Sequence, residues 1–215
     1  MRALVKTKAE PGLALQQVPD PQPGDGEVLI RIQATSLCGT DAHIYRWDEW
    51  AQQRIHPPRI IGHELCGEIV ELGPGVTSVA VGDYVAAESH LTCGVCFQCR
   101  TGQAHVCKNY RILGIDVDGS YAEYVVLPER VLWITSREIP PELACAQEPL
   151  GNAVYAALVE NLAGRSVLIS GCGPSGLFAA GVARTSGASM IIATDVSSYR
   201  LGLAKQMGVD HALAA

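Results

Sequence analysis

The stretch Ser166-Val-Leu-Ile-Ser-Gly-Cys-Gly-Pro-Ser-Gly-Leu-Phe-Ala-Ala180 joins a short apolar run, a glycine-rich turn and an apolar segment with no further breaks. This order predicts a strand, a tight turn and a helix. In such a unit Gly171 permits the turn, Gly173 lets the backbone approach a pyrophosphate, and Gly176 lets helix and strand pack closely. The N-terminus of the helix offers free amides and a partial positive charge to a phosphate. The glycine pattern alone is weak evidence, so the segments around it decide its meaning.

Those segments continue the alternation of strands and helices. We expect strands at 166–170 and 190–194, helices at 174–186 and 199–207, and the start of a third strand at 211–213. Alternation on this scale is typical of a parallel sheet with helical crossovers. Because an open doubly wound sheet normally has about five or six strands, we expect an incomplete Rossmann sheet and a chain that is cut short at its C-terminus.

An acidic residue follows the second of these strands. Asp195 lies nineteen residues past Gly176, where a carboxylate accepts hydrogen bonds from the ribose hydroxyls of NAD and repels the extra phosphate of NADP. Arg200 is close enough in sequence to contact the adenosine ribose or the adenine. The alternative is a plain turn at the start of a helix, with Asp195 as a cap. The flanking strand and helix favour the cofactor interpretation.

Residues 1–145 have a different pattern, in which short apolar runs are broken by Gly and Pro. Strands are expected at 2–6, 13–18, 27–37, 67–72, 83–87, 121–127 and 131–134. Many short strands with irregular loops predict a β-rich barrel or folded sheet. Helices are expected at 41–53 and, with interruptions by Pro149 and Gly151, at 142–162. The fold class is therefore α/β, with a β-rich domain at 1–145 and a second domain at 146–215.

Composition excludes several classes of protein. The chain has 215 residues, of which 48% are hydrophobic and 18% charged, and its formal net charge is −6. It can therefore bury a core, and the acidic balance without a basic block argues against a nucleic-acid partner. No apolar run reaches the ~18 residues of a membrane span, and the first residues lack the features of a signal peptide. We expect a cytoplasmic protein that contacts no membrane.

Four of the eight cysteines lie within fifteen residues. Cys93, Cys96 and Cys99 are each separated by two residues, and Cys107 follows after seven more. In a chain without a secretory signal, such a cluster indicates a metal site sooner than disulfides. Four thiolates make a closed tetrahedral zinc site, which is structural rather than catalytic. The alternative, buried free thiols, is a poor explanation for four cysteines at this spacing.

The sequence also offers ligands for a second metal site, one that would leave a coordination position open. Catalytic zinc typically has three protein ligands of mixed type and one position for water or substrate. Cys38 and His63 would supply two of these ligands, and either Glu64 or Glu148 the carboxylate. A lone Cys or His is more often a packing residue, so spacing alone does not establish this site.

A resemblance to a known family supports this second metal site. The pattern Gly62-His63-Glu64-x-x-Gly67-x5-Gly73-x-x-Val76 matches the signature of the zinc-containing alcohol dehydrogenases, in the medium-chain dehydrogenase/reductase superfamily. The cysteine cluster stands where that family carries its second zinc. The stretches at 38–51, 114–124 and 148–154 are similar to the members that oxidise L-threonine, and the tryptophan-bearing stretch at 38–51 points to that substrate.

The resemblance implies a GroES-like catalytic domain and a Rossmann domain, binding zinc and NAD. The implied activity is NAD-dependent oxidation of the 3-hydroxyl of L-threonine to 2-amino-3-oxobutanoate, by a homotetramer with a small-molecule substrate. Zinc ligands would be Cys38, His63 and Glu64 for the catalytic ion and Cys93, Cys96, Cys99 and Cys107 for the structural ion. Thr40 and His43 would pass the proton to solvent, supported by Glu148 near the zinc. The cofactor set would be Gly171, Gly173, Pro174, Ser175, Gly176, Asp195 and Arg200.

Simpler roles exist for some of these residues. Thr40 also suits a helix N-cap, and His43 a solvated helix position. Trp47 and Trp50, at helical spacing, suit core or oligomer contacts. Two other functions remain open: another zinc-dependent polyol or secondary-alcohol dehydrogenase, and a non-catalytic zinc-binding fragment.

Overall fold

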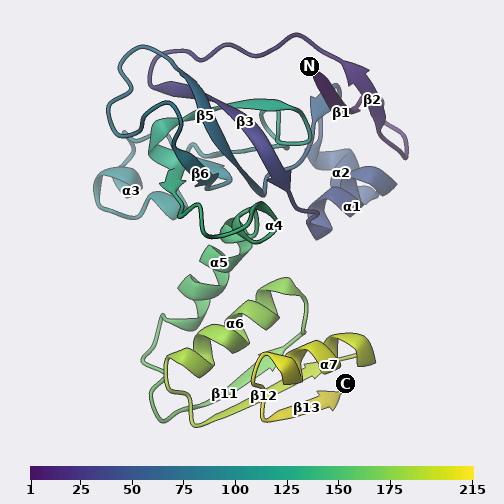
Figure 1. Ribbon diagram of the computed structural model, residues 1–215. Coiled ribbons are helices and arrows are strands. Elements are labelled where there is room, and N and C mark those ends of the chain that lie inside the picture. The colour runs from purple at the N-terminus through teal and green to yellow at the C-terminus, as the bar shows by residue number, and fades with distance from the viewer. The chain divides into compact units, whose positions relative to one another are not determined.

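The computed structural model describes residues 1–215 and divides them into two compact units, Met1–Glu148 and Pro149–Ala215 (Figure 1). The first unit is rich in β-strands, and the second alternates strands with helices. This confirms the predicted α/β class, with a β-rich part preceding a parallel sheet.

The first unit contains ten strands and four short α-helices, with α5 (Gln147–Ala157) beginning at its end. The strands are β1 (Arg2–Lys6), β2 (Ala14–Gln17), β3 (Glu27–Thr35), β4 (Arg59–Ile60), β5 (Leu65–Leu72), β6 (Tyr84–Ala87), β7 (His90–Leu91), β8 (Arg111–Ile112), β9 (Tyr124–Pro128) and β10 (Leu132–Ile134). The helices are α1 (Gly39–Arg46), α2 (Glu49–Arg54), α3 (Phe97–Arg100) and α4 (Pro141–Ala144), with 3-10 turns η1 (Ala104–Val106) and η2 (Glu129–Val131).

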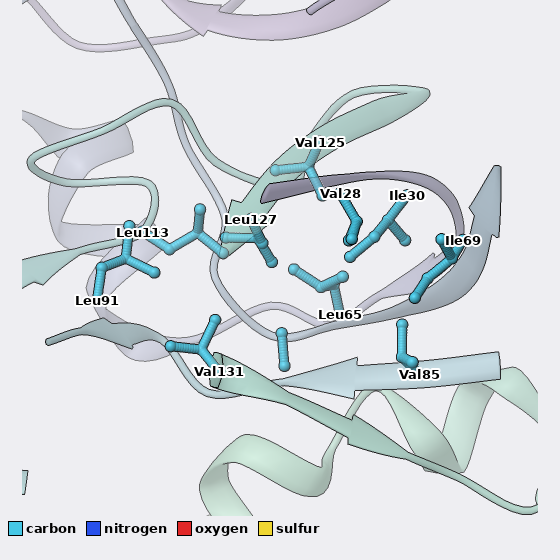
Figure 2. Packing of buried hydrophobic residues seen from close by; sticks show 11 residues of the cluster. Val28, Ile30, Leu65, Ile69, Val85, Leu91, Leu113, Val125, Leu127 and Val131 are labelled. Carbon is cyan, nitrogen blue, oxygen red and sulfur yellow. The ribbon is translucent and has the colours of Figure 1, made fainter. Parts of the chain in front are cut away.

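The largest sheet has the order β10-β6-β5-β3-β9, and all its pairs are antiparallel. Smaller sheets have the orders β2-β1-β4 and β7-β8. Alternate residues of a strand face one side of its sheet, so Val28 and Ile30 of β3 point into the core together with Leu65 and Ile69 of β5 (Figure 2). Each such side chain contributes about 1.5–3 kcal/mol when fully buried.

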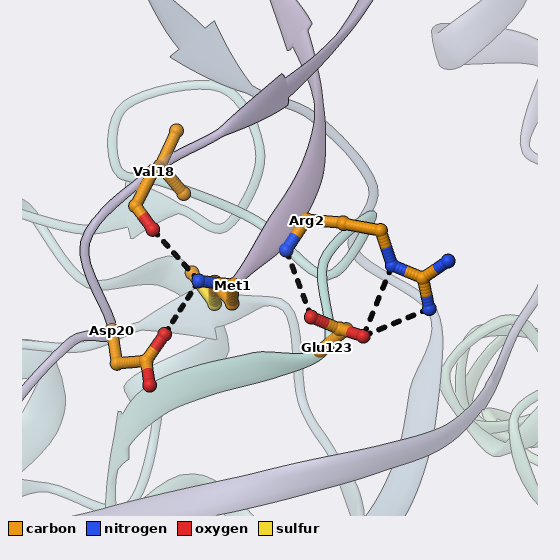
Figure 3. A network of polar contacts seen from close by, with 5 residues as sticks. All are labelled: Met1, Arg2, Val18, Asp20 and Glu123. Carbon is orange, nitrogen blue, oxygen red and sulfur yellow. Dashed lines mark hydrogen bonds and ion pairs between the residues drawn. The ribbon is translucent and has the colours of Figure 1, made fainter.

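Close contacts join the strands of the first unit to one another and to the N-terminus. A Cβ on Gly67 of β5 would lie 2.3 Å from the carbonyl oxygen of Arg31 in β3, so only glycine allows this spacing. Directly before β1, the Met1 ammonium donates hydrogen bonds to the Val18 carbonyl at 2.8 Å and to the Asp20 carboxylate at 2.6 Å (Figure 3). Beside it, Arg2 pairs with Glu123 at 2.9 Å. These contacts fix β1 against segments distant in sequence.

The single helix predicted at 41–53 is wrong, because the structure has two helices, α1 and α2. The chain turns at Trp47, whose φ of 56° and ψ of 46° are left-handed. The Asp48 side chain then accepts a hydrogen bond from Ala51 N at 3.1 Å and starts α2 as its N-cap. A capping side chain needs an extended backbone at its own position, so one helix could not run through Asp48.

The long helix predicted at 142–162 is also wrong. It is divided into α4 and α5, and α5 ends at Ala157. Pro149 lies in the first turn of α5, where its missing N–H has no intrahelical partner to lose. Beyond α5, the Asn161 side chain accepts a hydrogen bond from Ala163 N at 3.0 Å. Such local bonds favour a turn over a continuing helix.

The second unit is a parallel sheet of order β11-β12-β13, with α6 and α7 between its strands (Figure 1). Its elements are β11 (Ser166–Ser170), α6 (Pro174–Thr185), β12 (Met190–Asp195), α7 (Ser198–Gln206) and β13 (His211–Ala214). The predicted strand–helix alternation is confirmed. The buried core of this unit includes small alanines on α6 and Ile191 on β12. None of the helices in the chain has both the length and the apolar content of a membrane crossing.

Candidate metal and cofactor sites

The loop at 93–107, called the four-cysteine loop below, brings its cysteine sulfurs together. The Sγ atoms of Cys96 and Cys99 lie 3.5 Å apart, those of Cys96 and Cys107 3.8 Å, and those of Cys93 and Cys107 3.6 Å. A disulfide bond measures about 2.05 Å, and all these cysteines are free. Sulfurs bound to one zinc at about 2.3 Å would lie about 3.8 Å from each other. The donor set therefore fits one tetrahedral zinc ion.

The local sequence explains how this loop wraps. Gly94 and Gly102 have φ of 73° and 78°, conformations that a side chain disfavours, and they turn the chain on either side of α3. Backbone amides near the cluster favour the thiolate form: the amides of Val95 and Cys96 lower the pKa of Cys93 to about 6. In the same cluster, loss of solvent raises the pKa of Cys99 to about 12. The loop thus offers at least one thiolate, that of Cys93, as a ligand for a cation.

A second group of ligand atoms comes from separate segments. Cys38 is the N-cap residue of α1, while His63 and Glu64 directly precede β5. Their ligand atoms lie within 4.8 Å of one another. We call this group the Cys38 site. It pairs one sulfur, one nitrogen and one carboxylate, a mixed set that suits a zinc ion with a position left for another ligand.

Glycine contacts hold His63 in place. Gly62 has a φ of 91°, and a Cβ there would lie 2.3 Å from the ring of Tyr121. A Cβ on Gly114 would meet the Gly62 oxygen at 2.5 Å, and a Cβ on Gly119 would meet it at 2.1 Å. The residue before His63 is therefore enclosed by backbone and ring atoms from a segment more than fifty positions away. This packing fixes the backbone that carries the His63 imidazole.

Hydrogen bonds surround the Cys38 site. A hydrogen bond with His63 lowers the pKa of the Cys38 thiol, against the effect of burial. Burial opposes charge on His63, yet its bond with Cys38 and the nearby carboxylates raise its pKa above the ordinary value. Glu64 is 6% exposed and accepts a short hydrogen bond from the Ser36 hydroxyl. A buried imidazole and carboxylate beside a thiol are therefore held ready for a cation.

Asp41 is part of this environment, and the sequence analysis did not single it out. Its Oδ2 accepts hydrogen bonds from Cys38 N at 2.9 Å and from the Tyr121 hydroxyl at 2.8 Å. It is 4% exposed, and its Oδ1 has no hydrogen-bond partner. The signal in the sequence was the acidic residue three positions after the helix N-cap, a pattern typical of a capping box.

Thr40 and His43 lie on α1, after Cys38. The Thr40 hydroxyl is 3.7 Å from the Cys38 sulfur. The alternative role of Thr40 as an N-cap is wrong, because Cys38 holds that position and Thr40 lies within the helix. His43 Nδ1 forms a short hydrogen bond with Asp48, and its ring lies 6.0 Å from that of Trp50. Asp48 is thus a second partner that the sequence analysis missed.

Glu148 lies with a different set of residues. It is the second residue of α5, and its carboxylate groups with Glu88 and His90 within 4.8 Å. Of the two carboxylates considered for the Cys38 site, Glu64 is the one that shares its 4.8 Å group. Glu148 is nevertheless close enough to raise the pKa of His63 by its charge.

In the second unit, the glycine turn and Asp195 lie side by side. Gly171 has a φ of 96°, and a Cβ on Gly176 would lie 2.0 Å from the Gly171 oxygen, so helix and turn approach closely. Asp195, at the end of β12, accepts hydrogen bonds from Cys172 N and from the amide two residues on, each at 2.7 Å. These amides lower the pKa of Asp195. Arg200 lies 3.9 Å from the same carboxylate.

The start of α6 completes this turn. Gly173 is the N-cap of the helix, with an extended backbone, and Pro174 is its first residue. Proline is favoured there because its missing N–H would have no helical partner. Ser175 follows within the first turn, where backbone amides are free for a ligand. The residues of the predicted cofactor set are therefore gathered around one helix N-terminus and one strand end.

Comparisons with known proteins give this arrangement a context. Residues 24–137 match the family model described as alcohol dehydrogenase GroES-like domain. L-threonine 3-dehydrogenase from Pyrococcus furiosus is 54% identical over 213 residues, covering 99% of this chain and 61% of that protein. The chain therefore spans about three fifths of the length of the curated relatives it matches.

Solved structures with a similar fold include two alcohol dehydrogenases. The alcohol dehydrogenase from Thermus sp. ATN1 superposes with a TM-score of 0.88 at 29% identity, covering 100% of this chain and 63% of that one. A short chain alcohol dehydrogenase from Escherichia coli, solved with the cofactor NADH, gives a TM-score of 0.87 at 30% identity, covering 100% and 62%.

Proposed function

The chain belongs to the family of alcohol dehydrogenases with a GroES-like domain, and on that basis we propose that it acts as a zinc- and NAD-dependent L-threonine 3-dehydrogenase. One observation carries the proposal: Cys38, His63 and Glu64, from two separate segments, place their ligand atoms within 4.8 Å of one another. The 54% identity to a protein named L-threonine 3-dehydrogenase supports L-threonine as the substrate. The metal-binding domain is proposed for 1–145 and the NAD-binding domain for 146–215.

The Cys38 site would hold the catalytic zinc, because its mixed donors leave a position for a substrate oxygen. When bound, this zinc acts as a Lewis acid that lowers the pKa of the substrate hydroxyl. The buried carboxylate of Asp41 holds the N-terminus of α1 through the Cys38 amide. Cys38 is thereby kept at the end of a rigid helix.

Thr40 and His43 would move the proton released from the substrate. The Thr40 hydroxyl lies beside the Cys38 sulfur, and His43 lies one helical turn further on, with its side chain about half exposed. An imidazole can both accept and donate a proton, so His43 would pass the proton on to solvent. Asp48 would orient the ring through His43 Nδ1. Glu148 would support this transfer by its negative charge near His63.

The glycine turn would bind NAD, which accepts the hydride when bound. The N-terminal amides of α6 would hold the pyrophosphate, and Asp195 would accept hydrogen bonds from the ribose hydroxyls. Arg200 would contact the adenosine side of the cofactor. The four-cysteine loop would hold a structural zinc and take no part in the reaction.

Initial rates of NADH formation with L-threonine, sorbitol and 2,3-butanediol test the substrate. We expect the highest kcat/KM with L-threonine. Turnover of sorbitol or butanediol without turnover of threonine would support the alternative of a polyol or secondary-alcohol dehydrogenase. A chain that binds a single zinc and no NAD would support the alternative of a non-catalytic fragment.

A further inference from the structure

Lys6 is a buried charge that the proposed reaction does not use. It lies at the end of β1 and is 0% exposed, although lysine is almost never fully buried without a partner. Its ammonium donates hydrogen bonds to the Glu10 carbonyl at 2.5 Å and to the Gly12 carbonyl at 3.1 Å. Loss of solvent lowers the pKa of Lys6, and the charge of Glu10 opposes this shift. Because burying a charge costs free energy, favourable contacts have to compensate for it.

An aromatic ring provides a further contact. Lys6 Nζ lies 4.7 Å from the centroid of the Trp47 ring. Tryptophan attracts cations more strongly than other aromatic side chains do, and the attraction grows where water is excluded. Gly12, whose carbonyl binds the ammonium, also donates its amide to the Tyr45 carbonyl at 2.7 Å. The end of β1 and the loop after it are therefore attached to the end of α1 (Figure 1).

Trp47 has an unfavourable backbone conformation. Within residues 1–215 it is the one residue other than glycine with a positive φ, 56°. A bulky side chain rarely adopts this left-handed conformation, which persists only where the surrounding structure enforces it. The attraction between the Lys6 ammonium and the Trp47 ring offsets this cost. The buried cation and the strained residue therefore stabilise each other.

The conformation of Trp47 sets the position of Asp48 relative to His43. His43 lies in α1, Asp48 is the N-cap of α2, and the chain turns between the two helices at Trp47. Asp48 Oδ1 accepts a hydrogen bond from Ala51 N at 3.1 Å, while Asp48 Oδ2 bonds to His43 Nδ1. One carboxylate therefore joins both helices, and it reaches both partners only when the turn at Trp47 is kept.

We propose that Lys6 is a positioning residue that holds Trp47 in its left-handed conformation and so keeps Asp48 bonded to His43. This inference rests on the proposed role of His43 in proton transfer. A carboxylate accepts a hydrogen bond only from a ring nitrogen that carries a proton, so Asp48 selects the neutral form of His43 with its proton on Nδ1. In that form Nε2 is free to accept the proton released from the substrate. Lys6 touches no reacting atom and acts through Trp47 and Asp48.

Nitrogen-15 NMR of the zinc-loaded protein in alkaline solution tests this role without any turnover, because the ring shifts report which nitrogen of His43 carries the proton. The signals are assigned by their loss in His43→Gln. We expect the Nδ1–H form in the unchanged protein. Lys6→Met keeps the length of the side chain and removes the ammonium, so it should give a mixture of the Nδ1–H and Nε2–H forms.

Trp47→Leu is the second variant, because it removes the ring and leaves Lys6 in place. It should give the same mixture, and it decides the matter where Lys6→Met does not fold. Lys8→Met is the matched control, since Lys8 is a lysine two positions further on whose side chain is 74% exposed. It should keep the Nδ1–H form. The same form of His43 in the unchanged protein and in every folded variant overturns the proposal.

Turnover of L-threonine gives a second readout. We expect Lys6→Met to lower kcat about tenfold, to leave KM and zinc content unchanged, and to increase the solvent isotope effect on kcat, because proton transfer becomes slower. A lower kcat with an unchanged isotope effect would show a role in folding alone and overturns the proposal. No turnover by the unchanged protein would contradict the proposed dehydrogenase function, and the NMR result would still decide whether Lys6 positions His43.

Discussion

The four-cysteine loop and the Cys38 site are both candidate zinc sites, but they are built in opposite ways. The four-cysteine loop takes all its donors from fifteen consecutive residues, and short turns bring the sulfurs within 3.5–3.8 Å. The Cys38 site takes its donors from the start of α1 and from the segment before β5, and Tyr121, Gly114 and Gly119 hold those segments in place. We therefore expect the four-cysteine loop to depend on a bound ion for its shape, and the Cys38 site to depend on the fold.

Replacing a donor in each site tests this difference and should give the largest effect. We expect Cys96→Ser to lower the free energy of unfolding by about 3 kcal/mol or more, since structural zinc contributes directly to folding. Cys38→Ser should leave the thermal midpoint nearly unchanged and abolish turnover. Thermal unfolding followed by circular dichroism measures both. Equal destabilisation by the two substitutions would remove the distinction between the sites.

The glycine before His63 offers the next largest effect. Gly62→Ala places a Cβ 2.3 Å from the Tyr121 ring, and we expect it to lower the free energy of unfolding by about 2–4 kcal/mol. Gly75→Ala is the matched control, with a similar positive φ of 77° but no atom within 4 Å of the added Cβ. It should cost about 1 kcal/mol.

Denaturant titration compares these two variants. If Gly62→Ala were no more destabilising than Gly75→Ala, the close packing around His63 would not be what holds the Cys38 site. Loss of zinc from the Cys38 site in Gly62→Ala, with the four-cysteine loop still loaded, would instead sharpen the comparison.

The second unit should respond separately from both zinc sites. Asp195→Asn should weaken NAD binding about tenfold, because a carboxylate accepts ribose hydrogen bonds more strongly than an amide. Asp210→Asn is the control. Asp210 also accepts a hydrogen bond from a backbone amide, that of Ile191 at 2.7 Å, but it pairs with Arg184 away from the glycine turn. Calorimetric titration with NAD measures the affinities. Equal affinity in the two variants would end the ribose role of Asp195.

Acid should produce the smallest effect, at an ion pair that belongs to neither site. The Arg54 guanidinium lowers the pKa of Asp116 below its ordinary value. A depressed folded-state pKa gives stability that is present above the unfolded pKa of about 4 and is lost as pH falls through the folded value. Both side chains are partly exposed, so we expect under about 1 kcal/mol.

The free energy of unfolding at pH 6 and pH 3, in the unchanged protein and in Asp116→Asn, measures this contribution. The unchanged protein should lose more stability on acidification than the variant. An identical loss in the two proteins would show that the pair does not stabilise the fold.

The sequence predicted the second unit well because its signals are local. The strand at 166–170 and the turn that follows are encoded in adjacent residues, and the structure places β11 at those residues. The prediction of one helix at 41–53 was wrong, because the spacing of apolar residues does not show that Trp47 is left-handed or that Asp48 caps a new helix.

Around the candidate sites, the residues that were missed act across long separations. The Tyr121 hydroxyl reaches Asp41 from eighty positions away, and Ser89 meets Glu148 from fifty-nine away. No period or spacing in a single sequence reports such contacts, because they arise only when strands and helices pack. Donors that are adjacent in sequence, as in the four-cysteine loop, are the part of a metal site that can be predicted without the fold.

Zinc content, measured on the purified chain and on its Cys38→Ser variant, determines whether Cys38, His63 and Glu64 share a metal ion. We expect the variant to keep its fold and the zinc of the four-cysteine loop, and to lose one ion per chain. An unchanged zinc content in a folded Cys38→Ser chain would contradict it, because Cys38, His63 and Glu64 would then not share an ion.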